Sequence, residues 1–269
     1  MVIGTNTGSI NATFYLNLSN LSADKATKRL ASSSRLADAS DDAAGVAVSA
    51  KLDAVVRRLA SAAEGAQNLI SFSQTSDGFL GTVQNQLTRL GELAIRATDG
   101  TLSAADRANL NTEFVKVRDN ITNQIDSAKF NGTPVFDPSQ VVSSVVDAGG
   151  SNIYTLNIAD ARSNVSAVTA STINTAADAQ TAIIALNTAI ENITGSRAKV
   201  NSDVSALNQY IQNIGAEKVN TAQTNSRIRD ADFAEETTNL AKFRILGRSA
   251  TALLAQSNLS KQSVLGLLR

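Results

Sequence analysis

The feature that most constrains this chain is a run of apolar positions spaced alternately three and four residues apart. From Leu52 to Ala97 every such position is apolar except Ser73 and Ser76. A period of 3.5 residues places one continuous apolar seam along a helix, and such a seam needs a partner helix to cover it. The sequence therefore predicts a helix far longer than a compact globule of this size would contain.

A second seam lies in the other half of the chain. It runs from Ile183 to Ile214 in the same three-four steps and is interrupted by Arg197. The helix that carries it is predicted to span about 174–219, roughly 65–70 Å at ~1.5 Å per residue. Together the two seams predict a mainly α fold, an elongated antiparallel helical bundle or coiled coil.

Turn and capping residues divide the first half into two helices. Asp41 or Ser40 is the predicted N-cap of the long helix, and Asp99-Gly100 ends it. Ser103 with Asp106 has the spacing of a capping box, which predicts a second helix running back antiparallel along the first.

The middle of the chain differs in character. Both prolines, Pro134 and Pro138, lie there, and the runs VVSSVV, SNIYTLNIA and NVSAVTAS are β-prone. We expect a small β-hairpin region or three-stranded flap over 130–173.

Both chain ends carry amphipathic helices with no obvious cover within the predicted bundle. Asp232 with Glu235 has capping-box spacing and predicts the start of the last helix. Uncovered apolar lines of this kind usually need a partner, and the simplest partner is another copy of the chain. The residues predicted to form this polymerisation core are Ile10, Phe14, Leu18, Leu21, Leu30, Phe243, Leu246, Leu253, Leu254, Leu265 and Leu268.

Composition disfavours catalysis. The chain has no His and no Cys, which removes the usual proton shuttle, thiolate chemistry and Cys/His metal sites. The densest carboxylates, Asp38, Asp41 and Asp42, favour helix capping over a metal or general-base cluster, because no complementary ligands lie at fixed spacing. No phosphate-binding Gly motif occurs. We expect no enzyme activity, cofactor or metal.

Charge and hydropathy argue against two further partner classes. Lys+Arg and Asp+Glu balance at 24 each, so no overall positive charge favours nucleic acid or anionic membrane. No run approaches the ~18 apolar residues of a membrane span. The start of the chain lacks a basic region followed by an apolar stretch, so no cleaved secretory signal is predicted.

Several segments resemble bacterial flagellin. Residues 35–45, RLADASDDAAG, resemble the family's N-terminal R-[IL]-x-x-A-x-D-D-A-A-G signature, and 226–236, SRIRDADFAEE, resemble its C-terminal S-R-I-x-D-x-D-[FY]-A-x-E segment. The endings LLAQSN at 253–258 and VLGLLR at 264–269 are similar to the family's C-terminus, and Phe130-Asn131-Gly132 matches its F-N-G.

The resemblance implies an extracellular filament subunit for motility, exported without a cleaved signal, that polymerises as a homopolymer. It implies filament-core helices over 1–44 and 226–269, a helical rod domain from 45–129 and 174–225, and a short region at 130–173 in place of larger outer domains. Export chaperone, cap and junction proteins are the partners it implies.

One surface is carried over from the family residue by residue. Residues 86–94, QLTRLGELA, resemble the segment read by the vertebrate flagellin-sensing Toll-like receptor, with Arg89 and Leu93 at matching positions and Glu113 as a neighbouring acidic contact. Arg89 and Leu93 are four residues apart and off the apolar seam, so they are expected to share an outward face.

Two alternatives to a filament subunit remain. A hook–filament junction protein of the same apparatus shares the helical ends. A soluble coiled-coil adaptor would form a fixed small oligomer, whereas a filament subunit grows through contacts that do not close.

Overall fold

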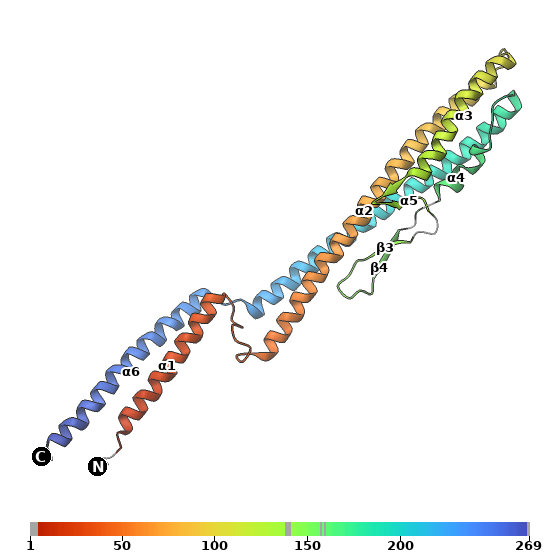
Figure 1. Cartoon of the computed structure of the whole chain (residues 1–269). Coiled ribbons are helices and arrows are strands. Elements are labelled where there is room, and N and C mark those ends of the chain that lie inside the picture. Colours follow the sequence, from red (N-terminus) through yellow and green to blue (C-terminus); the bar gives the residue numbers. More distant parts are fainter. Residues whose placement is uncertain (1–4, 138–140, 157, 159, 268–269) are drawn as a thin grey trace. The chain divides into compact units, whose positions relative to one another are not determined.

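The computed structural model describes residues 5–137, 141–156, 158 and 160–267, with the side chains of 264–267 excepted. Six helices and four short strands occur within these ranges (Figure 1). The helices are α1 (Thr7–Ser32), α2 (Ala43–Ala97), α3 (Ala104–Ser127), α4 (Ala161–Thr169), α5 (Ala176–Arg229) and α6 (Phe233–Leu267). The strands are β1 (Lys129–Phe130), β2 (Thr133–Pro134), β3 (Val142–Val145) and β4 (Ile153–Leu156). The mainly α fold with a small β-hairpin region is confirmed.

The chain divides into two compact units. The terminal unit comprises Met1–Val55 and Asn220–Arg269, and the central unit comprises Val56–Val219. Helices α2 and α5 continue across the division. The domain boundaries drawn at residues 44 and 226 fall in the first turn of α2 and the last turn of α5, and they stay a prediction.

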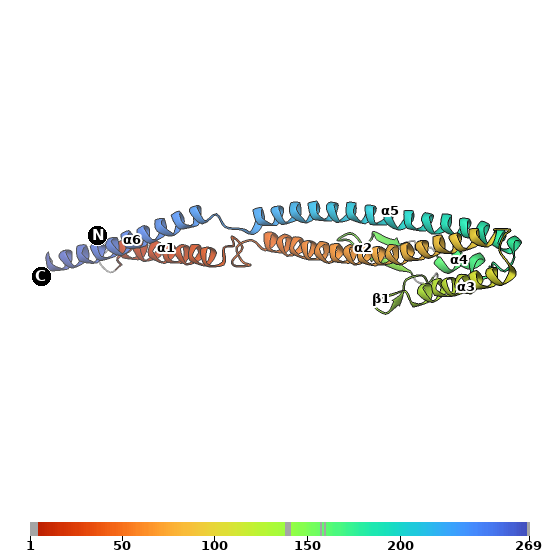
Figure 2. The same cartoon turned by 90° about the horizontal axis from the view of Figure 1, so that it is seen from above.

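The central unit is built on α2 and α5, which lie side by side (Figures 1 and 2). The α2 seam is buried as predicted, with Leu59, Leu80, Leu87 and Leu90 fully enclosed. Arg197, which interrupts the α5 seam, is accommodated because its guanidinium donates to both carboxylate oxygens of Asp77, at 2.8 and 3.1 Å. In the central unit, large aliphatic side chains and the Arg197–Asp77 ion pair thus hold α2 and α5 together.

Helix α3 runs antiparallel to α2, as predicted. The capping box is present: the Ser103 hydroxyl accepts from the Asp106 backbone, and the Asp106 carboxylate accepts from the Ser103 backbone. Successive contacts then descend α2, from Arg89 against Glu113 to Thr82 against Gln124. The predicted N-cap of α2 was off by one or two residues, because Asp42 accepts the Gly45 backbone N–H at 2.8 Å.

The middle of the chain departs from the predicted flap. Strands β1 and β2 form one antiparallel pair and β3 and β4 another, with no sheet joining the two pairs in the described residues. The run NVSAVTAS, expected as a strand, lies mostly in α4. The Asp160 carboxylate caps this helix, and Ala161, Val165 and Val168 are buried at helical spacing, which overrides the local β-propensity.

The β3–β4 hairpin is fixed to the long helices by specific contacts. The Tyr154 hydroxyl donates to Asp203 at 2.8 Å, and the Tyr154 ring packs edge-on against Tyr210. A Cβ at Gly65 of α2 would lie well inside contact distance of the Ser144 hydroxyl. Glycine at position 65 therefore permits the hairpin to approach the helix.

Candidate self-assembly surface

In the terminal unit, α1 and α6 lie side by side and antiparallel (Figures 1 and 2). Asn6 at one end of the pair donates to the backbone oxygen of Ser257, and Arg29 at the other end pairs with Glu236. Seam positions recur in three-four steps on both helices. The buried or half-buried ones are Ser9, Ala12, Leu16, Ser19, Ala23, Ala26 and Leu30 on α1, and Glu236, Leu240, Phe243, Gly247, Ala250, Leu254, Ser257 and Lys261 on α6.

The most buried positions of this seam are small. Ala12, Ser19 and Ala26 recur every seven residues on α1, opposite Gly247 and Ala250 on α6. Small side chains let two helix backbones approach closely, but they bury little apolar area per residue. Helices α1 and α6 therefore pack closely, while most of their larger apolar side chains stay outside the contact between them.

The predicted polymerisation core divides into two sets. Ile10, Phe14, Leu18, Leu21, Leu246 and Leu253 are exposed, with Phe14 at 62% and Leu253 at 63%. Leu30, Phe243 and Leu254 are half-buried in the seam between α1 and α6. Leu265 lies in α6, but its side chain is outside the described part of the structure, and Leu268 lies outside the described residues altogether. Within one copy, most of the predicted core thus points to solvent.

Some of the exposed side chains line an apolar hollow on one edge of the helix pair. Its volume is about 260 Å³, and its walls are almost wholly apolar. The lining residues are Tyr15, Leu18, Ser19, Phe243, Leu246, Ser249, Ala250 and Leu253. Phe14, next to this lining, packs edge-on against Tyr15 with ring centroids 5.6 Å apart. An apolar hollow of this kind is a site for another apolar group.

The opposite edge of the seam is polar. Heptad spacing places Thr13 and Asn20 of α1 and Arg244 and Thr251 of α6 there, one residue beyond the buried seam positions. The Asn20 side chain lies against Gly247, 3.7 Å from where a Cβ would be. The two edges of the helix pair therefore differ in chemistry.

Formal charge is also unevenly placed. Residues 1–23 carry no charged side chain, and after Glu236 the only ones before the C-terminal Arg269 are Lys242, Arg244, Arg248 and Lys261. The outward face of α1 before Asp24 can thus approach another surface without desolvating a charged side chain.

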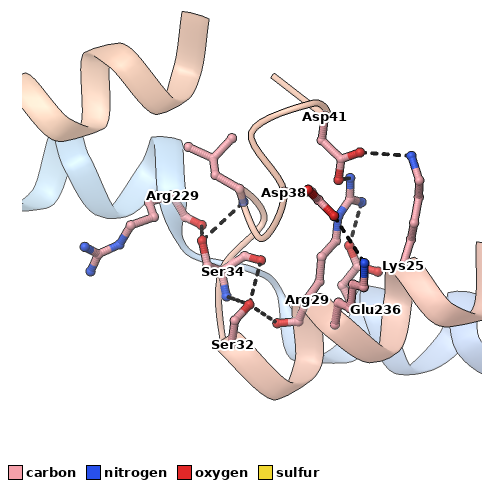
Figure 3. Close-up of polar contacts among 10 residues, drawn as sticks. Lys25, Arg29, Ser32, Ser34, Asp38, Asp41, Arg229 and Glu236 are labelled. Atoms are coloured by element: carbon pink, nitrogen blue, oxygen red, sulfur yellow. Dashed lines mark hydrogen bonds and ion pairs between the residues drawn. The ribbon is translucent and has the colours of Figure 1, made fainter. Parts of the chain in front are cut away.

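At the base of this helix pair, the two segments that resemble flagellin signatures come together (Figure 3). The Arg35 backbone N–H donates to the Arg229 oxygen at 2.7 Å, and Ser34 forms a β-bridge with Asp230. The Asp232 carboxylate accepts from the Ala234 and Glu235 backbones and caps α6, as predicted. The two linkers thus hold each other through backbone bonds.

Arg29 is the centre of the charged contacts in this junction. Its guanidinium donates to Glu236 at 3.1 Å and to Asp41 at 3.2 Å, and Lys25 donates to Asp41 at 2.9 Å (Figure 3). Burial of Arg29 lowers its pKa, but the hydrogen bonds to Glu236 and Asp41 outweigh this and raise it. The Lys25 hydrogen bond, together with that of Arg29, lowers the pKa of Asp41 below its ordinary value.

Sequence reasoning missed this junction. Asp41 was assigned to capping, whereas Asp42 caps α2 and Asp41 joins Arg29 and Lys25. The available signal was the pair of conspicuous motifs, one in each half of the chain, but nothing in the sequence showed that they meet.

The three residues matched to the receptor-contact segment do not share one exposed face. Arg89 pairs with Glu113 at 2.7 Å and with Glu92 at 2.8 Å; both carboxylates are exposed, and Arg89 is half-buried with 42% of its side chain exposed. Leu93, expected beside Arg89 on the outward face, is fully buried, so that expectation is wrong. The heptad interpretation assumed that a single partner helix covers α2. Helix α3 also packs on α2, and this widens the buried face.

The described residues contain no cluster of three or more acidic, His or Cys side chains placed to hold a metal ion. Within the same ranges, no helix combines the length and apolar character needed to cross a membrane.

Comparison with known proteins identifies the family. The model of the bacterial flagellin N-terminal helical region matches residues 3–141, and that of the C-terminal helical region matches 182–268. A flagellin of Halalkalibacterium halodurans is 32% identical over the full length of both chains. The crystal structure of Bacillus cereus flagellin superposes with a TM-score of 0.51 at 30% identity, covering 55% of this chain and 86% of that one.

A second solved structure shows how widely the fold is shared. A putative flagellar hook-associated protein from Vibrio parahaemolyticus superposes with a TM-score of 0.59, covering 71% of this chain and all of the other, but at 14% identity it supports the fold alone. The matches to both flagellin regions favour a filament subunit over a hook-associated protein. The chain belongs to the bacterial flagellin family and is a structural subunit of the flagellar filament.

Proposed function

We propose that copies of this chain polymerise through the exposed apolar faces of the terminal unit, α1 and α6. The observation that carries the proposal is the inverted burial there. Ala12, Ser19 and Ala26 are enclosed, while Phe14, Leu21 and Leu253 are open to water. A folded monomer rarely leaves so many large apolar side chains exposed on one helix pair.

Assembly supplies the missing burial. Enclosing one large apolar side chain contributes about 1.5–3 kcal/mol. The exposed set on α1 and α6 can therefore provide a substantial part of the association free energy, against which the loss of translational and rotational freedom must be set. The central unit already encloses the large side chains of its α2 seam, so this seam gains little from contact with a neighbour.

An extracellular location follows from this role, since the flagellar filament lies outside the cell. The principal partner of each chain in this proposal is another copy of the same chain, within a homopolymer. Export chaperone, cap and junction proteins are further partners proposed by family. A closed coiled-coil adaptor is disfavoured because the exposed apolar side chains of α1 and the apolar hollow are different surfaces, and contacts between unlike surfaces generate open assemblies unless the rotation closes.

Electron microscopy of negatively stained protein tests this function. The full-length chain and a chain of residues 56–219 are each concentrated with a precipitating salt. We expect long uniform filaments from the full-length protein and none from the truncated chain, whose far-UV circular dichroism should still show folded helices. Discrete small particles from the full-length chain would contradict the proposal.

Recognition by the flagellin-sensing Toll-like receptor stays a prediction. Arg89 and Glu113 are accessible, but each is already engaged in an ion pair, and Leu93 is enclosed. A receptor would therefore read the Arg89–Glu113 pair without the Leu93 side chain. Binding of purified receptor ectodomain to wild-type protein and to Arg89→Ala measures this: equal affinity would contradict a role for Arg89.

A further inference from the structure

Two apolar features of the terminal unit point in different directions. The first is the seam hollow, lined by Tyr15, Leu18, Phe243, Leu246 and Leu253. The second is a ridge on the outward face of α1 formed by Ile10, Phe14 and Leu21, spaced four and seven residues apart and each more than half exposed. We name the second feature the α1 ridge.

We propose that the seam hollow of one copy binds the α1 ridge of a second copy. This contact rests on the polymerisation proposed above and names the two surfaces that carry it. Because the ridge lies on the outward face of α1 and the hollow lies at the edge where α1 meets α6, no copy covers its own hollow with its own ridge. Two copies joined by one such contact therefore keep one free ridge and one free hollow, on different copies, and growth continues.

The size and chemistry of the hollow favour this occupant. At about 260 Å³ it is smaller than the ~300–1,000 Å³ of most small-molecule pockets. Its lining residues carry no charge, and neither does α1 before Asp24. Binding of a ridge in the hollow thus buries apolar surface from both sides without desolvating an ion, whereas a charged partner would find no complementary group there.

The spacing of the apolar side chains along the two helices also matches. Phe14 and Leu21 lie two turns apart on α1, and Leu246 and Leu253 lie two turns apart on α6. Two side chains of the ridge can therefore meet two side chains of the hollow wall in one register. The polar edge, with Thr251, offers no comparable apolar pair.

A complementation experiment tests the asymmetry of the contact. Phe14→Asp damages the ridge and leaves the hollow wall at Leu253, while Leu253→Asp damages the hollow and leaves Phe14. Each variant alone should lose filament formation. An equimolar mixture should form 1:1 dimers in sedimentation-velocity runs, because one intact ridge and one intact hollow remain. If the mixture stays as monomeric as each variant alone while the wild-type chain polymerises, the ridge-in-hollow contact is wrong.

A cross-linking experiment uses more conservative changes. The chain has no Cys, so each introduced thiol is unique. Phe14→Cys and Leu253→Cys proteins are mixed, brought to polymerising salt and oxidised. We expect the disulfide-linked heterodimer as the main product. Thr251→Cys on the polar edge is the matched control and should give little heterodimer with Phe14→Cys.

The outcomes separate the two proposals. Filaments that cross-link mainly as Phe14→Cys homodimers, or equally well through Thr251→Cys, would overturn the ridge-in-hollow contact and leave polymerisation standing. A wild-type chain that stays monomeric in polymerising salt would overturn both.

Discussion

The helices of the two units pair through the same heptad spacing, but the side chains that they enclose differ in size. The central unit places Leu59, Leu80, Leu87 and Leu90 on its α2 seam and encloses them completely. The terminal unit encloses Ala12, Ser19 and Ala26 and exposes Phe14, Leu18 and Leu21. A heptad seam therefore indicates that helices pair, but the size of the residues in it determines whether the pair is self-sufficient or depends on neighbours.

The sharpest test of this difference uses two adjacent leucines of α6. Leu253 is exposed and lines the hollow, whereas Leu254 is half-buried in the seam with α1. Both Leu253→Asp and Leu254→Asp should abolish filaments. Only Leu254→Asp should also lose helix in the monomer, because it buries a carboxylate between the paired helices.

Electron microscopy and far-UV circular dichroism of the two variants measure this pair of effects. Filaments of normal length from Leu253→Asp would remove the exposed face from the assembly mechanism. Equal loss of monomer helicity in both variants would mean that the two leucines are not on different faces.

A cavity-forming change should distinguish the units by stability. Leu87→Ala removes a fully enclosed side chain from the central unit and should lower the free energy of unfolding by about 2–5 kcal/mol. Leu21→Ala removes an exposed side chain and should change it by no more than about 0.5 kcal/mol in the monomer. Urea unfolding under non-polymerising conditions gives both values. Similar losses for the two variants would contradict the assigned burial.

Overpacking tests the close approach of α1 and α6. Ala26→Leu adds bulk where only 3% of the residue is exposed, and it should cost about 1–3 kcal/mol by separating the helices. Ala23 is a half-buried neighbour on the same helix, and Ala23→Leu should cost less. Thermal unfolding followed by circular dichroism compares them. A neutral Ala26→Leu would show that the seam has room for large residues.

The smallest expected effects are pH-dependent, and they have opposite senses in the two units. In the terminal unit, Lys25 and Arg29 lower the pKa of Asp41 below 3.8, so its contribution is present above that pH and is lost as the pH falls through the lowered value. In the central unit, burial and the Asp203 hydrogen bond raise the pKa of Tyr154 from 10.0 to about 12. The contribution of Tyr154 to the free energy of unfolding is therefore fully present below pH 10.0 and is lost as the pH rises towards about 12.

Unfolding of Asp41→Asn and Tyr154→Phe across pH measures these contributions. Asp41→Asn should flatten the acid side of the stability profile, and Tyr154→Phe should flatten the alkaline side. Unchanged slopes relative to the wild-type chain would contradict the respective ion pair or hydrogen bond as the cause.

Much of the fold was predictable because its signals are local. The three-four spacing from Leu52 to Ala97 predicted α2, and Ser103 with Asp106 predicted the start of α3. The segment that became α4 was assigned to a strand, since Val165 and Val168 have β-propensity and their helical spacing becomes decisive only once a packed surface is present. The burial of Leu93 was missed for a related reason: the sequence does not state how many neighbours cover one helix.

By itself the sequence determined the helical class, the caps at Ser103 and Asp232, the absence of His and Cys chemistry and the apolar character of both chain ends. Only the tertiary structure decided which apolar residues face inward. It placed Leu254 in the seam and Leu253 outside it, brought Arg29 to Asp41 and Glu236, and paired Ser34 with Asp230. The physical reason is that periodicity defines a face within one helix, whereas burial depends on the rotation and proximity of a second helix distant in the sequence.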